Sequence, residues 1–198
     1  MQRQIVLASS SRYRQGLLER LRLPFVTEVP AVDEAPLPGE GHRATAERLA
    51  LLKATVAAQR RPGSIVIGAD QVAELDGIAI GKPATPSAAR QQLLMMRGRT
   101  VHFHSGIAVF DSQSNRSLVA CVSTDVTFRP LSEQTIDTYL RIDQPYDCAG
   151  SAKIEALGIC LVQSVSSDDP TALIGLPLIA LTSMLATLGV ALPAQSVG

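Results

Sequence analysis

The sequence of 198 residues predicts an α/β fold: one domain over residues 1–198, with a mixed, twisted sheet flanked by helices. Two apolar runs, Ile5–Ala8 and Ile65–Ile67, have the composition of strands that are buried on both faces. Helical patterns alternate with the strand patterns along the chain. A long hairpin predicted over residues 100–128 adds antiparallel strands, so we expect the sheet to be mixed.

The first strand runs into a helix with an unusual start. Serines are favoured N-caps, and Ser9–Ser11 separate Ile5–Ala8 from leucines at helical spacing. A helix N-terminus offers unpaired amides and partial positive charge, which suit a phosphate. Arg12 and Arg14 oppose the helix dipole there, so an anionic ligand would explain them; two solvated surface arginines are the equally weighted alternative.

The later elements follow from the same signals of periodicity, capping and turns. Predicted strands are Phe25–Val29, Ser64–Leu75, Ile78–Ile80, Thr100–Phe110, Leu118–Phe128 and Leu157–Val165. Predicted helices are Ala44–Gln59, Ser87–Arg97, Ser132–Arg141 and Leu178–Leu188. In the second helix, Leu49, Leu52 and Val56 are expected to form the apolar stripe, with Lys53 off it.

Composition excludes several classes of function. Lys plus Arg and Asp plus Glu both number 18, and this balance argues against binding a nucleic acid polymer. Three widely spaced cysteines form no metal or disulfide pattern and indicate a reduced, cytoplasmic protein. Leu176–Leu192 is the most membrane-like run, but polar residues interrupt it and a buried helix is the better interpretation.

Several charged residues are predicted at the ends of elements. Asp70 is expected to terminate an apolar strand, where an acid is costly unless it is used. Asp33 and Glu34 lie in a proline-bounded loop, and Arg14, Lys53 and Lys82 supply positive charge. Carboxylates with a hard divalent cation and a set of Lys and Arg side chains describe a triphosphate site.

Seven segments of this chain resemble the Maf nucleotide pyrophosphatases, in order and at similar spacing from about Gln4 to Leu188. They are Leu7–Arg14, Val32–Glu34, Lys53, Gly68–Gln71, Gly81–Pro83, Cys148–Gly150 and Gly175–Leu178. Gln71 after Asp70, together with Ala149–Glu155, resembles the branch that acts on 7-methyl-GTP. Arg12 and Tyr13 depart from the family pattern, which usually has Pro and often Trp there.

The resemblance implies a Maf or inosine triphosphate pyrophosphatase-like fold with a nucleotide cleft. It also implies hydrolysis of the α–β phosphoanhydride of 7-methyl-GTP, with Mg²⁺, Mn²⁺ or Co²⁺ as cofactor, and a homodimer. Asp70 corresponds to the general base. The implied roles of the other residues are phosphate binding by Ser9, Ser11, Arg14, Lys53 and Lys82, base specificity at Tyr13, Gln71 and Glu155, and metal binding by Asp70, Asp33 and Glu34.

A physical argument also favours the methylated base. A cationic 7-methylguanine ring stacks well on an aromatic face such as Tyr13, and a carboxylate such as Glu155 can accept both N–H donors of guanine. Two alternatives stay open. One is a dTTP/UTP pyrophosphatase of the same family, and the other is a nucleotide-binding regulator of cell division without turnover.

Overall fold

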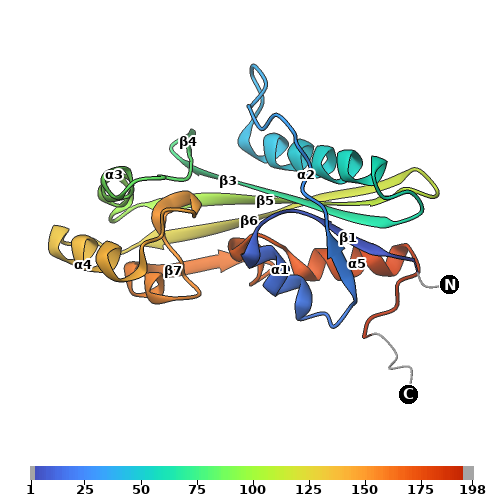
Figure 1. The fold of residues 1–198 in the computed structure, drawn as a ribbon. Coiled ribbons are helices and arrows are strands. Elements are labelled where there is room, and N and C mark those ends of the chain that lie inside the picture. Colours follow the sequence, from blue (N-terminus) through green and yellow to red (C-terminus); the bar gives the residue numbers. More distant parts are fainter. Residues whose placement is uncertain (1–2, 194–198) are drawn as a thin grey trace. The chain divides into compact units, whose positions relative to one another are not determined.

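The computed structural model describes residues 3–193, and within them seven strands form one mixed sheet in the order β2-β1-β3-β5-β6-β7, with β4 paired to β3 (Figure 1). The strands are β1 (Ile5–Ala8), β2 (Phe25–Thr27), β3 (Ile65–Leu75), β4 (Ile78–Ile80), β5 (Thr100–Asp111), β6 (Arg116–Phe128) and β7 (Val162–Ser167). The helices are α1 (Arg12–Glu19), α2 (His42–Gln59), α3 (Pro86–Met96), α4 (Glu133–Asp143) and α5 (Leu178–Thr187). The predicted α/β class is confirmed.

Two compact units make up the chain. The first comprises Met1–Gln71, Ser105–Val122 and Asp169–Gly198, and the second comprises Val72–His104 and Ser123–Asp168. Strands β3, β5 and β6 contribute residues to both units. The single domain over residues 1–198 stays a prediction.

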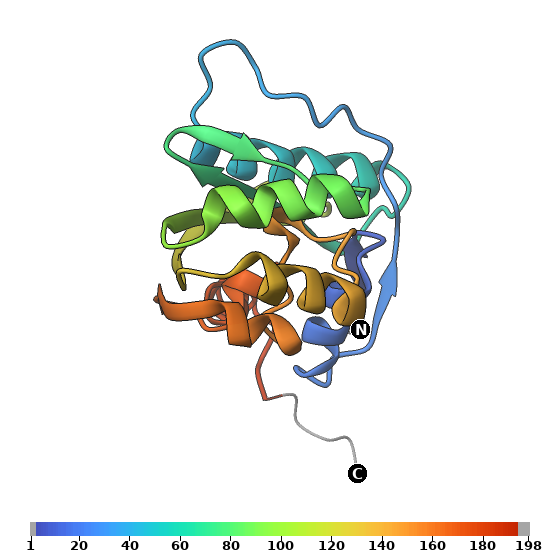
Figure 2. The same cartoon turned by 90° about the vertical axis from the view of Figure 1, so that its left-hand side faces the viewer.

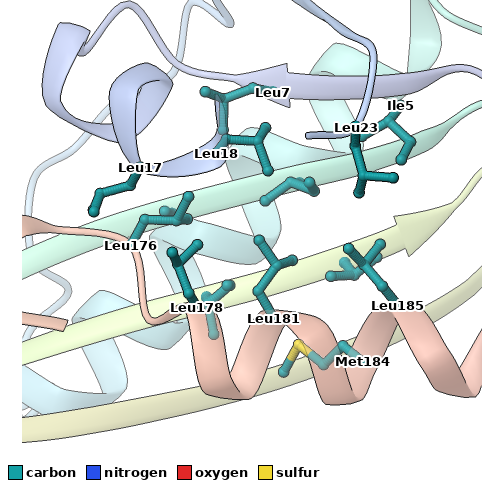
Figure 3. Close-up of a cluster of buried hydrophobic side chains, with 14 of the residues drawn as sticks. Ile5, Leu7, Leu17, Leu18, Leu23, Leu176, Leu178, Leu181, Met184 and Leu185 are labelled. Carbon is teal, nitrogen blue, oxygen red and sulfur yellow. The ribbon is translucent and has the colours of Figure 1, made fainter. Parts of the chain in front are cut away.

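In the first unit, parallel strands are covered by helices on both faces. Strand β1 pairs in parallel with β2 and with β3, Ile5 lying opposite Phe25 and Ile65. Helices α1 and α5 pack on one face, where their leucines meet Ile5, Leu7 and residues of β3 and β5 (Figure 3). Helix α2 covers the other face (Figure 1). Burial on both faces explains why the strand sequences are continuously apolar.

The contact between α2 and the sheet is very close, and this corrects the predicted apolar stripe. A methyl group on Gly68 would overlap the main-chain oxygen of Ala50, and one on Gly106 would overlap that of Ala46. Alanines fill the closest part of this contact, and most of the buried residues of α2 are alanines. Of the predicted stripe, Leu49 is buried as expected. Lys53 lies on this buried face, whereas Leu52 and Val56 are partly exposed.

Asp70 lies in the middle of β3 and does not terminate it. The strand continues for five more residues, and the last three of them, Ala73–Leu75, pair with the antiparallel strand β4. The parallel pairing with β1, however, ends at Gly68. Asp70 therefore stands just beyond the carboxyl end of the parallel pairing, which is where ligands bind in α/β sheets.

In the second unit, the tight turn at Asp76 and Gly77, both with positive φ, joins β3 to β4 as predicted. Helices α3 and α4 pack side by side (Figure 2), and Arg90 of α3 pairs with Glu133 and Asp137 of α4.

The predicted strand Leu157–Val165 is wrong in its first half. Leu157–Leu161 forms the 3₁₀ helix η2, and β7 begins only at Val162. Gly158 is pressed against the backbone of Lys153, where a Cβ atom would approach within 2.6 Å. The chain coils back at this point, so the apolar run cannot be extended.

The run Leu176–Leu192 contains α5, whose Leu181 and Leu185 are fully buried in the core. No helix within residues 3–193 combines the length and the apolar character that a membrane span requires. None of the three cysteines, Cys121, Cys148 and Cys160, forms a disulfide bond within the described residues.

Candidate active site

Ser9 and Ser11 lie where β1 leads into α1. Ser9 is buried, and its hydroxyl accepts a hydrogen bond from the Ser11 amide at 3.1 Å. Ser11 is the N-cap of α1, and its hydroxyl accepts from the Arg14 amide at 3.4 Å. Because each hydroxyl acts as an acceptor within the turn, its O–H remains a donor suited to a phosphate oxygen.

Arg14 is half-buried beside these serines, and a main-chain carbonyl fixes it. Its Nε donates to the carbonyl oxygen of Gly175 at 2.9 Å. Burial lowers the pKa of Arg14, and the charges of Asp70 and Glu34 oppose this shift. The guanidinium is thus in the electrostatic range of two carboxylates, and it stays charged at neutral pH.

Lys53 joins those two carboxylates. Its Nζ lies 2.6 Å from Asp70 Oδ1 and 2.6 Å from Glu34 Oε1. The side chains of Lys53 and Asp70 are only 10% and 11% exposed, whereas that of Glu34 is 61% exposed. Gly68 and Asp70 share the face of β3 that meets α2, so the close approach of helix and strand brings Lys53 to Asp70.

The acidic residues of the loop differ in what they contact. Glu34 reaches Lys53, but Asp33 Oδ1 accepts from the amide of Ala35 at 2.9 Å and so closes a turn within the loop. The loop between β2 and α2 is thereby brought to Lys53 through Glu34.

The structure places the predicted specificity residues in different surroundings. Gln71 Nε2 donates to Ser105 Oγ at 2.9 Å and to the carbonyl oxygens of Ala172 and Leu173 at 3.1 Å, so its amide nitrogen holds the segment before α5. The guanidinium of Arg12 lies 4.9 Å from the centroid of the Tyr13 ring, and its Nη2 donates to the Tyr13 hydroxyl. One face of that ring is already occupied by a cation.

Lys82 and Glu155 belong to the second unit, and both are exposed. The loop that carries Glu155 is anchored at Lys153, whose amide donates to the Tyr139 hydroxyl at 3.0 Å. Burial, together with Asp143, raises the pKa of Tyr139, so its hydroxyl stays protonated.

A divalent cation fits this donor set only in part. Within residues 3–193, no group of three or more His, Cys, Asp and Glu side chains is arranged to hold a metal ion. Asp70 and Glu34 nevertheless converge on the same ammonium group. Two carboxylates completed by phosphate oxygens of a nucleotide match the way in which Mg²⁺ is commonly bound.

Three contributors to the site were not predicted from sequence. The Gly175 carbonyl fixes Arg14, and Arg48 and Glu40 hold the acidic loop. Gly175 belongs to Gly175–Leu178, a segment that resembles the Maf family but whose residue types predict no contact with Arg14. The spacing of Glu40 and Arg48 does not distinguish them from charged residues that are exposed to solvent near the start of a helix.

Capping serines, two cations and two carboxylates beyond the carboxyl end of the parallel strands define an α/β protein with a site suited to a phosphorylated ligand. The family model described as Maf-like protein matches residues 4–188, and the chain belongs to the Maf family.

Relatives named 7-methyl-GTP pyrophosphatase are similar along nearly the whole chain. The protein from Cupriavidus pinatubonensis is 56% identical over 181 residues, which cover 91% of each chain. The one from Burkholderia thailandensis is 56% identical over 188 residues, covering 93% of this chain and 87% of the relative. The one from Bordetella avium is 56% identical over 185 residues, covering 93% of each.

Proposed function

We propose that this protein is a nucleoside triphosphate pyrophosphatase that hydrolyses the α–β phosphoanhydride of 7-methyl-GTP to 7-methyl-GMP and pyrophosphate. The observation that carries the proposal is the buried Asp70 carboxylate paired with Lys53 and grouped with Glu34 and Arg14. The names of relatives at 56% identity support both the reaction and the methylated base.

Asp70 is assigned as the general base that orients a water molecule and accepts its proton. Its buried position favours this role, because a carboxylate with little access to solvent keeps a fixed direction toward the reacting water. Arg14 and Lys53 neutralise negative charge on the phosphates, and the hydroxyls of Ser9 and Ser11 donate hydrogen bonds to them. The resemblance assigns Lys82 to the phosphates as well.

Asp70 and Glu34 are the residues that would hold the divalent cation, and Asp33 is assigned beside them from the resemblance. When bound, Mg²⁺, Mn²⁺ or Co²⁺ supplies positive charge that polarises the phosphate oxygens. Lys53 contacts both carboxylates in the structure. Its ammonium holds the two carboxylates close together before a nucleotide arrives.

Selection of the base is assigned to Tyr13, Gln71 and Glu155. Glu155 would accept the N–H donors of guanine, and Tyr13 would stack on the cationic ring. Since Arg12 covers one face of Tyr13, the base stacks on the other face or displaces Arg12. Gln71 acts through the carbonyls of Ala172 and Leu173 that its amide holds.

The test is pyrophosphate release from 7-methyl-GTP, GTP, UTP and dTTP with each of the three metals. We expect the highest kcat/KM with 7-methyl-GTP and a loss of about a hundredfold or more in Asp70→Asn. Asp125→Asn, an exposed acid of the second unit, is the control and should retain activity. A preference for UTP or dTTP would reject the base assignment, and tight binding without product would reject catalysis.

We also infer a cytoplasmic location and a homodimer. The three free thiols support a reducing compartment, and the homodimer is implied by the family resemblance. Sedimentation of the purified protein tests the second inference, with a monomer at all concentrations as the contrary result.

A further inference from the structure

The loop between β2 and α2, residues 28–41, carries Asp33 and Glu34 and is called the acidic loop here. Glu40 fixes the end of this loop that leads into α2. Arg48 of α2 forms a two-bonded ion pair with Glu40, with Nε 2.6 Å from Oε1 and Nη2 2.8 Å from Oε2. The Thr45 hydroxyl and the Leu37 amide donate to the same carboxylate at 2.9 and 3.1 Å. Charge-assisted bonds in this forked arrangement fix direction as well as distance.

Arg48 makes one more contact, and this one reaches the loop beside Glu34. Its Nη2 donates to the carbonyl oxygen of Ala35 at 3.0 Å. Ala35 follows Glu34 directly, and its amide is held by Asp33. Both main-chain polar groups of Ala35, the residue after Glu34, are therefore restrained: its amide by Asp33 within the loop and its carbonyl by Arg48 from helix α2.

The electrostatics of this arrangement keep it in place at neutral pH. The hydrogen bonds from Arg48 lower the pKa of Glu40 to about 2, so the carboxylate stays ionised. Glu40, and after it Asp33 and Asp70, raise the pKa of Arg48. Arg48 thus experiences the charge of the acids at the site without contacting Asp70.

Glu34 needs such a restraint. Its side chain is 61% exposed and comes from a loop, and loops are more mobile than the helices and strands that they connect. Lys53 and Arg48 both belong to α2, so a single rigid helix holds the end of the Glu34 side chain and the backbone beside it.

We propose that Arg48 is a positioning residue for the acidic loop: by binding Glu40 and the Ala35 carbonyl, it holds Glu34 against Lys53 before metal and nucleotide bind. The part of this inference that concerns metal and nucleotide rests on the proposed function. The part that concerns the loop does not, and the two can be measured separately.

The experiment compares Arg48→Met and Arg48→Lys with Arg43→Met. Arg43 is the matched control because it lies on the same helix and contacts Glu47 and the carbonyl oxygen of Cys121, both outside the loop. Hydrogen exchange of the free protein reports loop order over residues 31–40. Steady-state kinetics with 7-methyl-GTP report KM, kcat and the metal concentration for half-maximal activity.

In Arg48→Met we expect faster exchange at residues 33–37 and an increase of about tenfold in both KM and the half-maximal metal concentration, with a much smaller change in kcat. Arg48→Lys keeps the positive charge but cannot make the two parallel hydrogen bonds to Glu40. Its exchange rate, KM and half-maximal metal concentration should lie between those of Arg48→Met and wild type. Arg43→Met should match wild type in both measurements. If Arg48→Met does not fold, Glu40→Gln carries the same test, because it weakens the ion pair and keeps an oxygen for Thr45.

Unchanged exchange in Arg48→Met would overturn the inference about the loop. Faster exchange with wild-type KM and metal dependence would overturn the inference that the loop position matters for catalysis. Faster exchange in a protein whose wild type hydrolyses no nucleotide would refute the proposed function and leave the positioning of the loop supported.

Discussion

The close contact between α2 and β3 makes Gly68→Ala a severe test of the structure. The added methyl group would overlap the Ala50 oxygen and lie 2.8 Å from the Ala54 amide nitrogen. Ordinary contacts begin near 3.4 Å, so α2 must move away by roughly 1 Å or more. Both neighbours are main-chain atoms that no rotamer change can remove, so we expect a cost of about 3 kcal/mol or more.

For a chain of this length the cost corresponds to a fall in Tm of about 6–12 °C. Thermal unfolding followed by circular dichroism measures it. Because α2 carries Lys53, its displacement should also lengthen the 2.6 Å contact with Asp70 and lower kcat/KM.

Gly16→Ala is the matched control. Gly16 lies in α1 with nothing near the position of a Cβ atom, so alanine should stabilise the protein by about 0.5–1 kcal/mol. The two substitutions add the same methyl group and should shift Tm in opposite directions. A Gly68→Ala protein with wild-type Tm would refute the close packing described for α2.

Two further predictions concern other parts of the chain. Tyr139→Phe removes the oxygen that holds the Lys153 amide and should cost about 1–3 kcal/mol. Tyr139→Phe should also reduce the ratio of kcat/KM for 7-methyl-GTP to kcat/KM for GTP, and Tyr146→Phe is the control. An unchanged ratio in Tyr139→Phe would contradict the role of Tyr139 in anchoring the loop that carries Glu155. Burial raises the pKa of Asp111, but hydrogen bonds led by that of Arg3 outweigh it and lower the pKa to about 2 from an ordinary 3.8. The resulting stability is present above pH 4 and is lost as the pH falls from about 4 to about 2. Acid titration of unfolding should show this loss in the wild type and a smaller loss in Arg3→Met, because the hydrogen bonds from Ser114 and Gln113 remain.

Much of the fold follows from short-range signals. Ile5–Ala8 is buried on both faces, and Ser11 and Ser132 cap the helices that they precede. The turn at Asp76 and Gly77 has the positive φ values that this pair of residues predicts. Each of these signals depends on residues that are close in sequence. The structures that they predict therefore form in the folded protein independently of which distant segments pack against them.

The errors arise where packing between distant segments decides the outcome. The helical pattern predicts Lys53 off the apolar stripe, but the close approach permitted by Gly68 puts Lys53 on the buried face of α2. The apolar run before Asp70 predicts a strand that ends at this acid, but β3 continues to Leu75 and pairs there with β4. Gly158 permits a close approach to Lys153 within a 3₁₀ helix, where the apolar run predicts a strand.

The site was predictable by residue type and only partly by arrangement. The first unit contains Ser9, Ser11, Arg14, Lys53, Glu34 and Asp70, and Lys53 contacts both carboxylates. Their roles at a phosphate site stay predictions. That Glu34 and Asp70 share one lysine could not be inferred, because the loop and the strand are far apart in sequence. The assignments for Lys82 and Glu155 stay predictions.

Two guanidinium groups near the acids are bound by peptide carbonyls, Arg14 by Gly175 and Arg48 by Ala35. A carbonyl is present whichever amino acid carries it, so substitution of a neighbouring residue leaves such a bond available. Insertion or deletion of one residue in either segment shifts the register and removes the acceptor. Among homologues, the lengths of these two segments should therefore vary less than their composition.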